Sequence, residues 1–376
     1  MPCSIAPDAV GLFLRLAALV TPSGRERAAA DLCLEYLREI GLEPDEDDAG
    51  ARIDGDTGNI YAHVPGTVEG TPIFLCAHLD TVPAVAPIEP LQTNGRITNV
   101  HDAILGADNK ATVAGMLDAV RRVLEEGIPH AGIELVLTPQ EEVGLIGVRA
   151  FDVSRLRSRV GFVYDHAGPI GGIITRAPSQ KAVRLEFTGA AAHAGIEPEK
   201  GRSAILAAAR AVSAMRLGRL DEGTTANVGT IEGGEARNVV PSRCLVQAEV
   251  RSLDHARCAE EASAMVEAAT IAATETGCGV EVEVTELYRA YRVAPSSAAY
   301  GLARTALAAA GYPAYEISTG GGADTHVFVE RGLDCVNLCS GMEQIHTPHE
   351  HIDVDDVEGL VRLTLELVRA AAAPRS

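Results

Sequence analysis

The sequence is poor in basic residues. Only three of its 376 residues are lysines (Lys110, Lys181 and Lys200), and 52 acidic residues outnumber the 32 lysines and arginines. The formal net charge is therefore −20 at pH 7. Proteins that bind nucleic acid need a basic surface to displace the counterions of the phosphates, so we expect no nucleic-acid partner.

Long hydrophobic runs are also absent. The most apolar early stretch, VGLFLRLAALV at residues 10–20, is short and is interrupted by Arg15. It has no basic leader, and no small-residue cleavage pattern follows it. The stretch predicts a buried amphipathic helix, and we expect a cytoplasmic protein with no membrane partner.

The sequence has no paired cysteine motif. Its eight cysteines are scattered, no C-x-x-C occurs, and the two closest are Cys335 and Cys339. In a cytoplasmic protein such cysteines are better interpreted as free buried thiols than as a disulfide framework.

The first half of the chain alternates between helical and strand-like segments. Residues 24–40 carry apolar residues at helical spacing and end at Gly41. A second helical run covers residues 111–127, and strand-like apolar runs lie at residues 59–64, 72–79, 132–138 and 160–164. This alternation predicts an α/β core with a mixed, largely parallel sheet and flanking helices.

The pattern changes at about Pro178. Residues 178–289 read as strand, helix, strand, strand, helix and strand, which is the order of a split βαβ (ferredoxin-like) α+β sandwich. The alternating pattern then returns, with a helix near 297–311, a short strand at 335–339 and a closing helix at 355–372. A chain of this length commonly forms two compact units. We therefore predict a domain at 178–289 inserted into a core built from residues 1–177 and 290–376.

Polar side chains stand where the apolar strands end. In FLCAHLDTVP, residues 74–83, His78 and Asp80 are two residues apart and so lie on one face of a strand. Strand ends in open α/β sheets converge on one crevice. Comparable positions, at strand ends, helix starts or the loop near the carboxyl end, are held by Asp108, Glu141, Glu142, Asp165 and His346.

Each of these residues has an ordinary structural explanation when it is taken alone. An Asp before a helix is commonly an N-cap, and a Glu-Glu pair in a loop is commonly solvated. Taken together, two histidines and several carboxylates are the donors that zinc accepts. So many buried acidic groups would be costly to ionise without a cation, so the set predicts a dinuclear metal centre.

The motifs have a specific order along the chain: His78-x-Asp80, Gly-Ala-Asp108-Asn-Lys, Glu141-Glu142-x-Gly, Asp165 and His346-x-x-x-Glu350. This series resembles the metal site of the zinc-dependent peptidases that include peptidase T, carboxypeptidases, aminoacylases and desuccinylases. The greatest resemblance is to the peptidase T-like (tripeptidase-like) group. It spans nearly the whole chain and includes the inserted domain.

The resemblance implies a ligand set for two divalent ions. His78 and Asp165 would bind one ion, Glu142 and His346 would bind the other, and Asp108 would bridge them. Zinc is the expected metal, although cobalt or manganese could use the same donors.

The resemblance also implies roles for the remaining polar residues of the motifs. Asp80 would orient the ring of His78. Glu141 would take a proton from the metal-bridging water and pass it to the leaving amine. The peptide bond between Asp108 and Asn109 is expected to be cis. Many relatives have a second Asp where this chain has Asn109, so no role is assigned to that side chain.

Substrate contacts are expected from the inserted domain, which would act as a lid. His193 resembles the lid histidine of the family, and Asn238 and Arg237 follow in a second lid motif. Arg251 could pair with a substrate carboxylate or form a salt bridge on the sheet face. Gly321 belongs to a glycine-rich turn that could present backbone N–H groups to an anion or could simply open a helix.

The reaction implied by the resemblance is hydrolysis of the N-terminal peptide bond of a short peptide such as a tripeptide. In this family, Asp at the position of Asp165 accompanies aminopeptidases, whereas Glu accompanies carboxypeptidases and deacylases. A carboxypeptidase or an N-acyl-amino-acid deacylase or desuccinylase is the alternative. A non-catalytic binding protein with the same fold is a third interpretation, and a homodimer could form through the lid.

Overall fold

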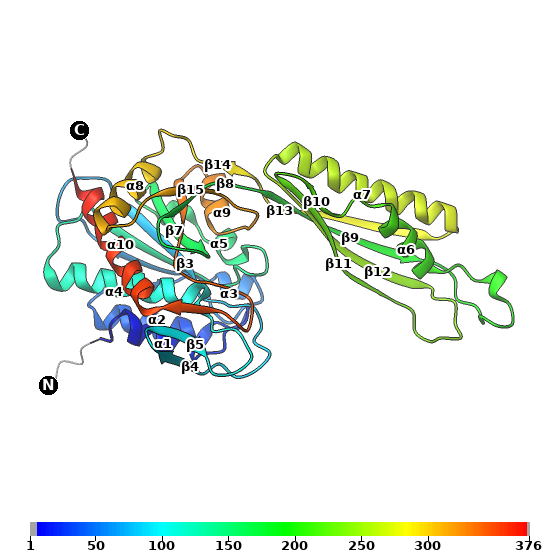
Figure 1. Cartoon of the computed structure of the whole chain (residues 1–376), viewed down its shortest axis with the longest axis horizontal. Coiled ribbons are helices and arrows are strands. Elements are labelled where there is room, and N and C mark those ends of the chain that lie inside the picture. Colours follow the sequence, from blue (N-terminus) through cyan, green and yellow to red (C-terminus); the bar gives the residue numbers. More distant parts are fainter. Residues whose placement is uncertain (1–5, 374–376) are drawn as a thin grey trace. The chain divides into compact units, whose positions relative to one another are not determined.

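The computed structural model describes residues 6–373 (Figure 1). It divides into two compact units. The core unit comprises residues up to Thr175, Val293–Ser318 and the chain from Ala323 onward. The inserted unit comprises Arg176–Arg292 and Thr319–Gly322. The short glycine-rich segment Thr319–Gly322 thus groups with the inserted unit, whereas the expected boundaries assign it to the core.

The core unit contains a mixed sheet with a parallel centre. In spatial order its strands are β1 (Asp45–Glu46), β2 (Ile60–Val64), β6 (Ile133–Thr138), β3 (Ile73–His78), β7 (Val160–His166), β16 (Asp334–Cys339) and β8 (Gly172–Ala177), and β15 (Tyr315–Ser318) also pairs with β8. The neighbours among β6, β3, β7 and β16 are parallel, and the β1–β2, β2–β6 and β16–β8 pairs are antiparallel. The predicted fold class is confirmed.

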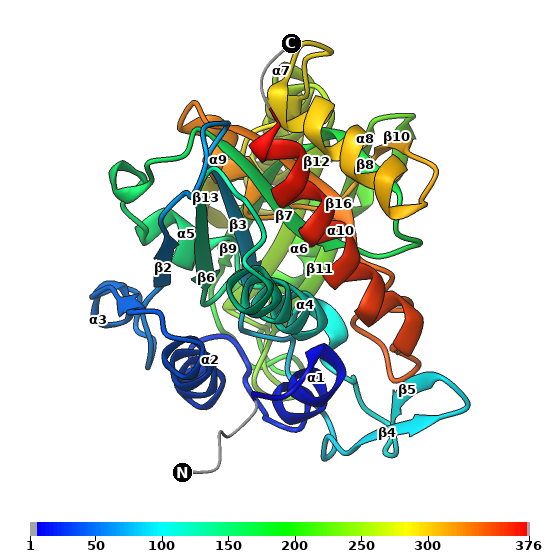
Figure 2. The same cartoon turned by 90° about the vertical axis from the view of Figure 1, so that its left-hand side faces the viewer.

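Helices bury the central strands. Every residue of β3 and β6 is buried, as expected when helices cover both faces of a parallel sheet. Helix α4 packs against β3 and β7, and α1 and α10 in turn pack on α4 (Figure 2). The helices of this unit are α1 (Ala9–Ala17), α2 (Arg27–Glu39), α3 (Ala49–Arg52), α4 (Ala107–Glu126), α5 (Ile146–Ala150), α8 (Ala298–Ala310), α9 (Thr325–Glu330) and α10 (Val354–Ala372).

A small antiparallel sheet was not predicted. It contains β4 (Pro90–Thr93), β5 (Arg96–Asn99) and β17 (His351–Asp353), in the order β17-β5-β4. Its strands have only three or four residues each, and β4 is largely exposed, so they lack the apolar runs that identify the central strands. The local signal was the dipeptide Asn94-Gly95, whose positive φ angles of 52° and 81° suit a tight hairpin.

The inserted unit is an antiparallel sheet with two helices. Its strands are β9 (Ser179–Thr188), β10 (Gly218–Asp221), β11 (Thr224–Gly233), β12 (Arg243–Ser252) and β13 (Gly279–Tyr288), in the spatial order β10-β11-β12-β9-β13. Helices α6 (Ala204–Ala214) and α7 (His255–Thr276) pack on each other and on the sheet. The two-residue strand β14 (Tyr291–Arg292) pairs with Arg176 and Ala177. The chain order is the predicted one, with β10 added.

The inserted unit has its own apolar core. Alternate residues of β9, including Val183, Leu185 and Phe187, are buried and pack with the alanine-rich faces of α6 and α7. Within residues 6–373, the structure contains no helix that combines the length and the apolar character required to cross a membrane.

Gly161 in β7 offers a test of the packing that supports the strand carrying Asp165. A Cβ atom at Gly161 would lie 2.0–2.3 Å from ring atoms of Phe74, and that ring packs against Phe328 at a centroid distance of 4.7 Å. We expect Gly161→Ala to lower the free energy of unfolding by about 1–3 kcal/mol, because the rings have no room to move.

The control is Gly301→Ala in α8, where a Cβ would meet nothing within 4 Å. This exposed helical site should become more stable by up to about 1 kcal/mol, because alanine has the higher helix propensity. Urea unfolding of both variants measures the two effects, and equal stabilities for them would contradict the packing argument.

Candidate metal centre

The strand ends bring the predicted site residues to one edge of the core sheet. His78 is the last residue of β3 and pairs in register with Thr138, the last residue of β6. Glu141 and Glu142 follow β6, and Asp165 is near the end of β7. Since β3, β6 and β7 are parallel, their carboxyl ends share one edge of the sheet.

Asp108 and His346 complete two clusters. His78 Nε2 lies 3.2 Å from Asp108 Oδ1 and 3.5 Å from Asp165 Oδ1. His346 Nε2 lies 3.2 Å from Asp108 Oδ2 and 2.8 Å from Glu142 Oε1. In each cluster the three candidate ligand atoms lie within 4.8 Å of one another. The two carboxylate oxygens of Asp108 therefore face different clusters.

The donor chemistry fits two divalent cations. Each cluster offers one imidazole nitrogen and carboxylate oxygens from two residues, a donor set that zinc accepts. Burial, followed by the charge of Asp165, holds the pKa of Glu141 well above its usual range. Burial also raises the pKa of Asp165 to about 7, although the charge of His78 opposes this rise. Positive ions between these carboxylates would relieve their mutual repulsion.

The pKa values of the two histidines are also raised, by the neighbouring carboxylates. Burial alone would lower the pKa of His78, but the carboxylates of Asp165, Asp108 and Asp80 raise it well above its usual range. Hydrogen bonds to Asp108 and Glu142 raise the pKa of His346 to about 10. Both rings therefore lie in a strongly negative field, as expected for histidines that share a site with a cation.

Asp80 holds more than the ring of His78. Its backbone oxygen is 3.0 Å from His78 Nδ1, closer than its carboxylate Oδ1 at 3.3 Å. The carboxylate accepts the backbone N–H of Glu141 at 2.9 Å and that of Glu142 at 3.2 Å. It also accepts the hydroxyl of Ser23 at 2.7 Å. Asp80 therefore joins His78 to the Glu pair, a contact that the motif alone did not reveal.

Glu350 supports the segment that carries Asp108. Its carboxylate accepts the backbone N–H groups of Leu105, Gly106 and Asp108 at 2.8, 2.9 and 3.0 Å. The expected cis peptide bond between Asp108 and Asn109 is present. The side chain of Asn109 is buried, and neither its nitrogen nor its oxygen has a hydrogen-bond partner among the described residues.

Two other supporting residues were missed in the sequence. Asn337 accepts the backbone N–H of Asp165 at 2.9 Å and donates to the backbone oxygen of Asp165 at 3.0 Å. Asp324 is buried and accepts the Thr138 hydroxyl at 2.6 Å. The sequence feature that could have indicated Asn337 is its position as the single polar residue inside the apolar strand CVNLC.

The predicted substrate residues all belong to the inserted unit. His193 forms an antiparallel bridge with Val239, and the N–H of Ala194 donates to the backbone oxygen of Asn238 at 3.0 Å. The segment with Arg237 and Asn238 therefore lies beside His193. Their roles toward a substrate stay predictions.

Arg251 lies beside the glycine-rich turn. It donates to the backbone oxygen of Gly320 at 3.1 Å and pairs with Glu249 at 3.1 Å, which is the sheet-face ion pair considered as its alternative. The N–H of Gly321 donates to the hydroxyl of Thr319 at 3.0 Å. That N–H group thus has an internal acceptor, and a role for Gly321 toward a substrate stays a prediction.

Comparison with known proteins identifies the family. The family model described as "Peptidase family M20/M25/M40" matches residues 74–370. The structure is similar to that of the aminopeptidase PepT from Bacillus cereus, with 34% identity, a TM-score of 0.86, and coverage of 97% of this chain and 98% of that chain.

Two further relatives agree with this match. A tripeptidase from Staphylococcus aureus is 32% identical, with a TM-score of 0.90 and coverage of 97% of this chain and 98% of that chain. Peptidase T of Aeromonas hydrophila is 27% identical over 74% of this chain and 69% of its own length. These matches confirm the resemblance to the peptidase T-like group, and the chain belongs to the metallopeptidase family M20/M25/M40.

Proposed function

We propose that this M20 peptidase is a dinuclear aminopeptidase that removes the N-terminal residue of short peptides, tripeptides in particular. The observation that carries the proposal is Asp108, whose two carboxylate oxygens face separate clusters at 3.2 Å from His78 and from His346. The similarity to an aminopeptidase PepT and to a tripeptidase supports the choice of substrate.

The chain's own residues supply the ligands for two ions. His78 and Asp165 would hold one, Glu142 and His346 would hold the other, and Asp108 would contribute to both. Zinc is our first choice, and cobalt or manganese would suit the same donors. When bound, two such ions lower the pKa of a water molecule and polarise the carbonyl of the scissile bond.

Glu141 is the proposed general base. Its neighbour Glu142 is committed to the second cluster, so the carboxylate of Glu141 is free to exchange protons. It takes a proton from the attacking water and passes it to the leaving amine. The pKa of Glu141 is raised, first by burial and then by the charge of Asp165. A raised pKa favours the protonated form, so Glu141 can hold the proton after it leaves the water and before it reaches the amine.

We also propose where the enzyme acts and how it assembles. We place the enzyme in the cytoplasm, where the seven cysteines described by the structure, all free, would stay reduced. We also propose that a second copy of the chain docks on the inserted unit, which would act as the lid.

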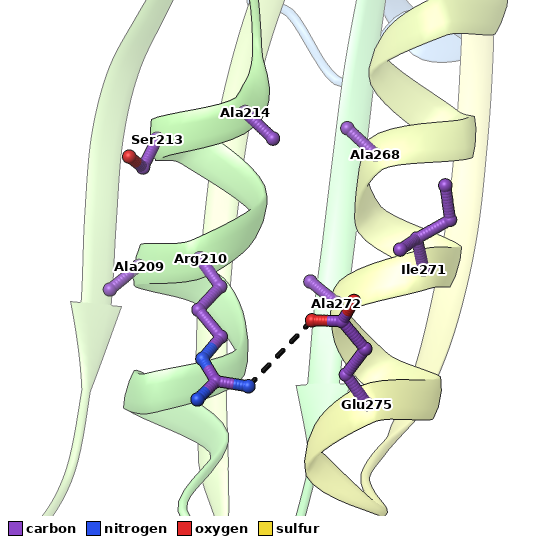
Figure 3. Close-up of a pocket in the computed structure, with 8 residues that line it drawn as sticks. All are labelled: Ala209, Arg210, Ser213, Ala214, Ala268, Ile271, Ala272 and Glu275. Atoms are coloured by element: carbon purple, nitrogen blue, oxygen red, sulfur yellow. Dashed lines mark ion pairs between the residues drawn. The ribbon is translucent and has the colours of Figure 1, made fainter.

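A groove of about 580 Å³ runs between α6 and α7 and supports this dimer (Figure 3). It is lined by alanines together with Ile271, and Arg210 and Glu275 face each other across it at 3.7 Å. A two-fold partner could exchange this ion pair while it covers Ile271, whose exposed fraction is 52%.

The substrate is tested with Ala-Ala-Ala and N-acetyl-Ala-Ala-Ala, each offered to the zinc-loaded protein. We expect cleavage of the free peptide only. Glu141→Ala should lower kcat by about 100-fold to 10,000-fold, as expected for loss of a general base, while elemental analysis still finds two ions per chain.

Cleavage of the acylated peptide alone would replace the proposal with a deacylase or carboxypeptidase activity. If the wild-type protein cleaved neither peptide, the proposed substrate class would be wrong, and a non-catalytic binding protein would become the better interpretation.

The ligand set predicts how variants bind metal. Asp108→Ala removes a donor from both clusters, so we expect it to lose both ions on dialysis, and the rise in Tm on zinc addition should disappear. The control is His349→Ala, which removes an exposed histidine three residues after His346 that belongs to neither cluster. Retention of two ions by Asp108→Ala would argue against a shared ligand.

The dimer is tested by sedimentation. Ile271→Asp adds a charge to the groove, so we expect the variant to sediment as a monomer while the wild-type protein sediments as a dimer. The exposed residue Val85, in the core unit, supplies the control Val85→Asp, which should leave the dimer intact. A monomeric wild-type protein would exclude this assembly.

A further inference from the structure

The backbone of Gln140 and of the Glu pair that follows it is held by two carboxylates that lie outside both clusters. The N–H of Gln140 donates to Glu26 Oε1 at 3.1 Å. The N–H groups of Glu141 and Glu142 donate to the two oxygens of Asp80 at 2.9 and 3.2 Å. The N–H groups of three consecutive residues therefore donate to carboxylates, and both carboxylate residues, Glu26 and Asp80, are fully buried.

The loop before α2 is attached to the end of β3. The hydroxyl of Thr21 donates to the backbone oxygen of Leu79 at 3.1 Å, and the N–H of Thr81 donates to the backbone oxygen of Thr21 at 2.9 Å. The Ser23 hydroxyl donates to Asp80. These contacts place Glu26, three residues after Ser23, against the loop that follows β6.

Glu26 occupies an unfavourable environment. Its Oε1 also accepts the N–H of Gly24 at 2.7 Å, but its Oε2 is buried and has no hydrogen-bond partner among the described residues. Burial raises the pKa of Glu26 to about 7, and the charge of Asp80 adds to the rise. A buried carboxylate with an unpaired oxygen is destabilising. A purely structural position would favour a neutral side chain here.

The residue that Glu26 holds is itself strained. Gln140 has a φ angle of +53°, a left-handed conformation that non-glycine residues rarely adopt. This conformation turns the chain immediately before Glu141. The hydrogen bond from its N–H to Glu26 anchors this turn.

We propose that Glu26 is a positioning residue for Glu141: by holding the N–H of Gln140 it keeps the left-handed turn from which the base projects. The inference rests on the proposed role of Glu141 as the general base. The carboxylate of Glu26 accepts the N–H groups of Gly24 and Gln140, neither of which is a candidate ligand, so removal of this side chain should affect the base more than ion binding.

The pH dependence of stability separates this role from a structural one. The pKa of Glu26 is raised from 4.5 to about 7, so ionising it in the folded protein lowers stability as the pH rises through this range. The charge of Asp80 acts on it, and Arg25 and Arg27 flank it in the sequence; the guanidinium of Arg27 pairs with Glu46 and Asp31. We therefore expect Glu26→Gln to raise Tm at pH 8 and to have little effect near pH 5. A stabilising contact would give the reverse.

Kinetics with zinc-loaded protein and Ala-Ala-Ala test the positioning. Glu26→Ala should lower kcat by about 100-fold, the size expected for a misplaced catalytic group, with KM nearly unchanged and two ions retained. Glu26→Gln keeps an acceptor for the Gln140 N–H and should recover most of the lost kcat. Wild-type kcat in Glu26→Ala, an equal loss in both variants, or loss of the ions would overturn the proposal.

Glu134 provides a matched control at the opposite end of β6. It is also a buried carboxylate, and it accepts the backbone N–H groups of Arg157 and Ser158 at 3.0 and 2.7 Å. Glu134→Ala should lower Tm and leave kcat of the folded protein unchanged.

Hydrogen exchange gives a readout that does not depend on activity. Glu26→Ala should speed amide exchange at residues 140–142 and leave residues 157–158 unchanged, and Glu134→Ala should do the opposite. If the wild-type protein fails to cleave peptides, the proposed function is wrong. This exchange pattern would still show that Glu26 holds the loop at residues 140–142. Unchanged exchange at 140–142 in Glu26→Ala would overturn that role.

Discussion

The site depends on one carboxylate that serves two clusters. Asp108 directs one oxygen toward His78 and the other toward His346, at 3.2 Å in both cases. A carboxylate can do this only if its backbone is held still, because a small rotation would favour one cluster over the other. Glu350 supplies this restraint by accepting three N–H groups around the start of α4, those of Leu105, Gly106 and Asp108.

The same device recurs around the site: polar side chains hold the main chain of the candidate ligands. Asp80 accepts the N–H groups of Glu141 and Glu142, and Asn337 bonds to both the N–H and the oxygen of Asp165. Fixing the backbone restricts where each ligand atom can lie, and the ligand's own side chain stays available to an ion. The candidate centre is therefore preorganised by hydrogen bonds to the main chain.

This organisation concentrates buried acidic groups, which lowers stability. Glu141, Asp165, Asp324 and Glu26 all have pKa values raised first by burial. The apolar strands β3 and β6 and the covering helix α4 offset the cost, because nearly all their apolar side chains are buried. Functional sites commonly accept such local costs, which are balanced by stability elsewhere in the fold.

The sequence by itself predicted the main strands and helices of both units, because apolar periodicity is a local pattern. It also marked the polar residues at strand ends as candidate metal-site residues, and the family resemblance assigned the ligands among them. Only the tertiary structure revealed the supports Glu26, Asn337 and Glu350, the small sheet of β4, β5 and β17, and the grouping of Thr319–Gly322 with the inserted unit. The physical reason is sequence separation. Asp108 and Glu350 are 242 residues apart, and a hydrogen bond over such a distance leaves no periodic trace in the chain.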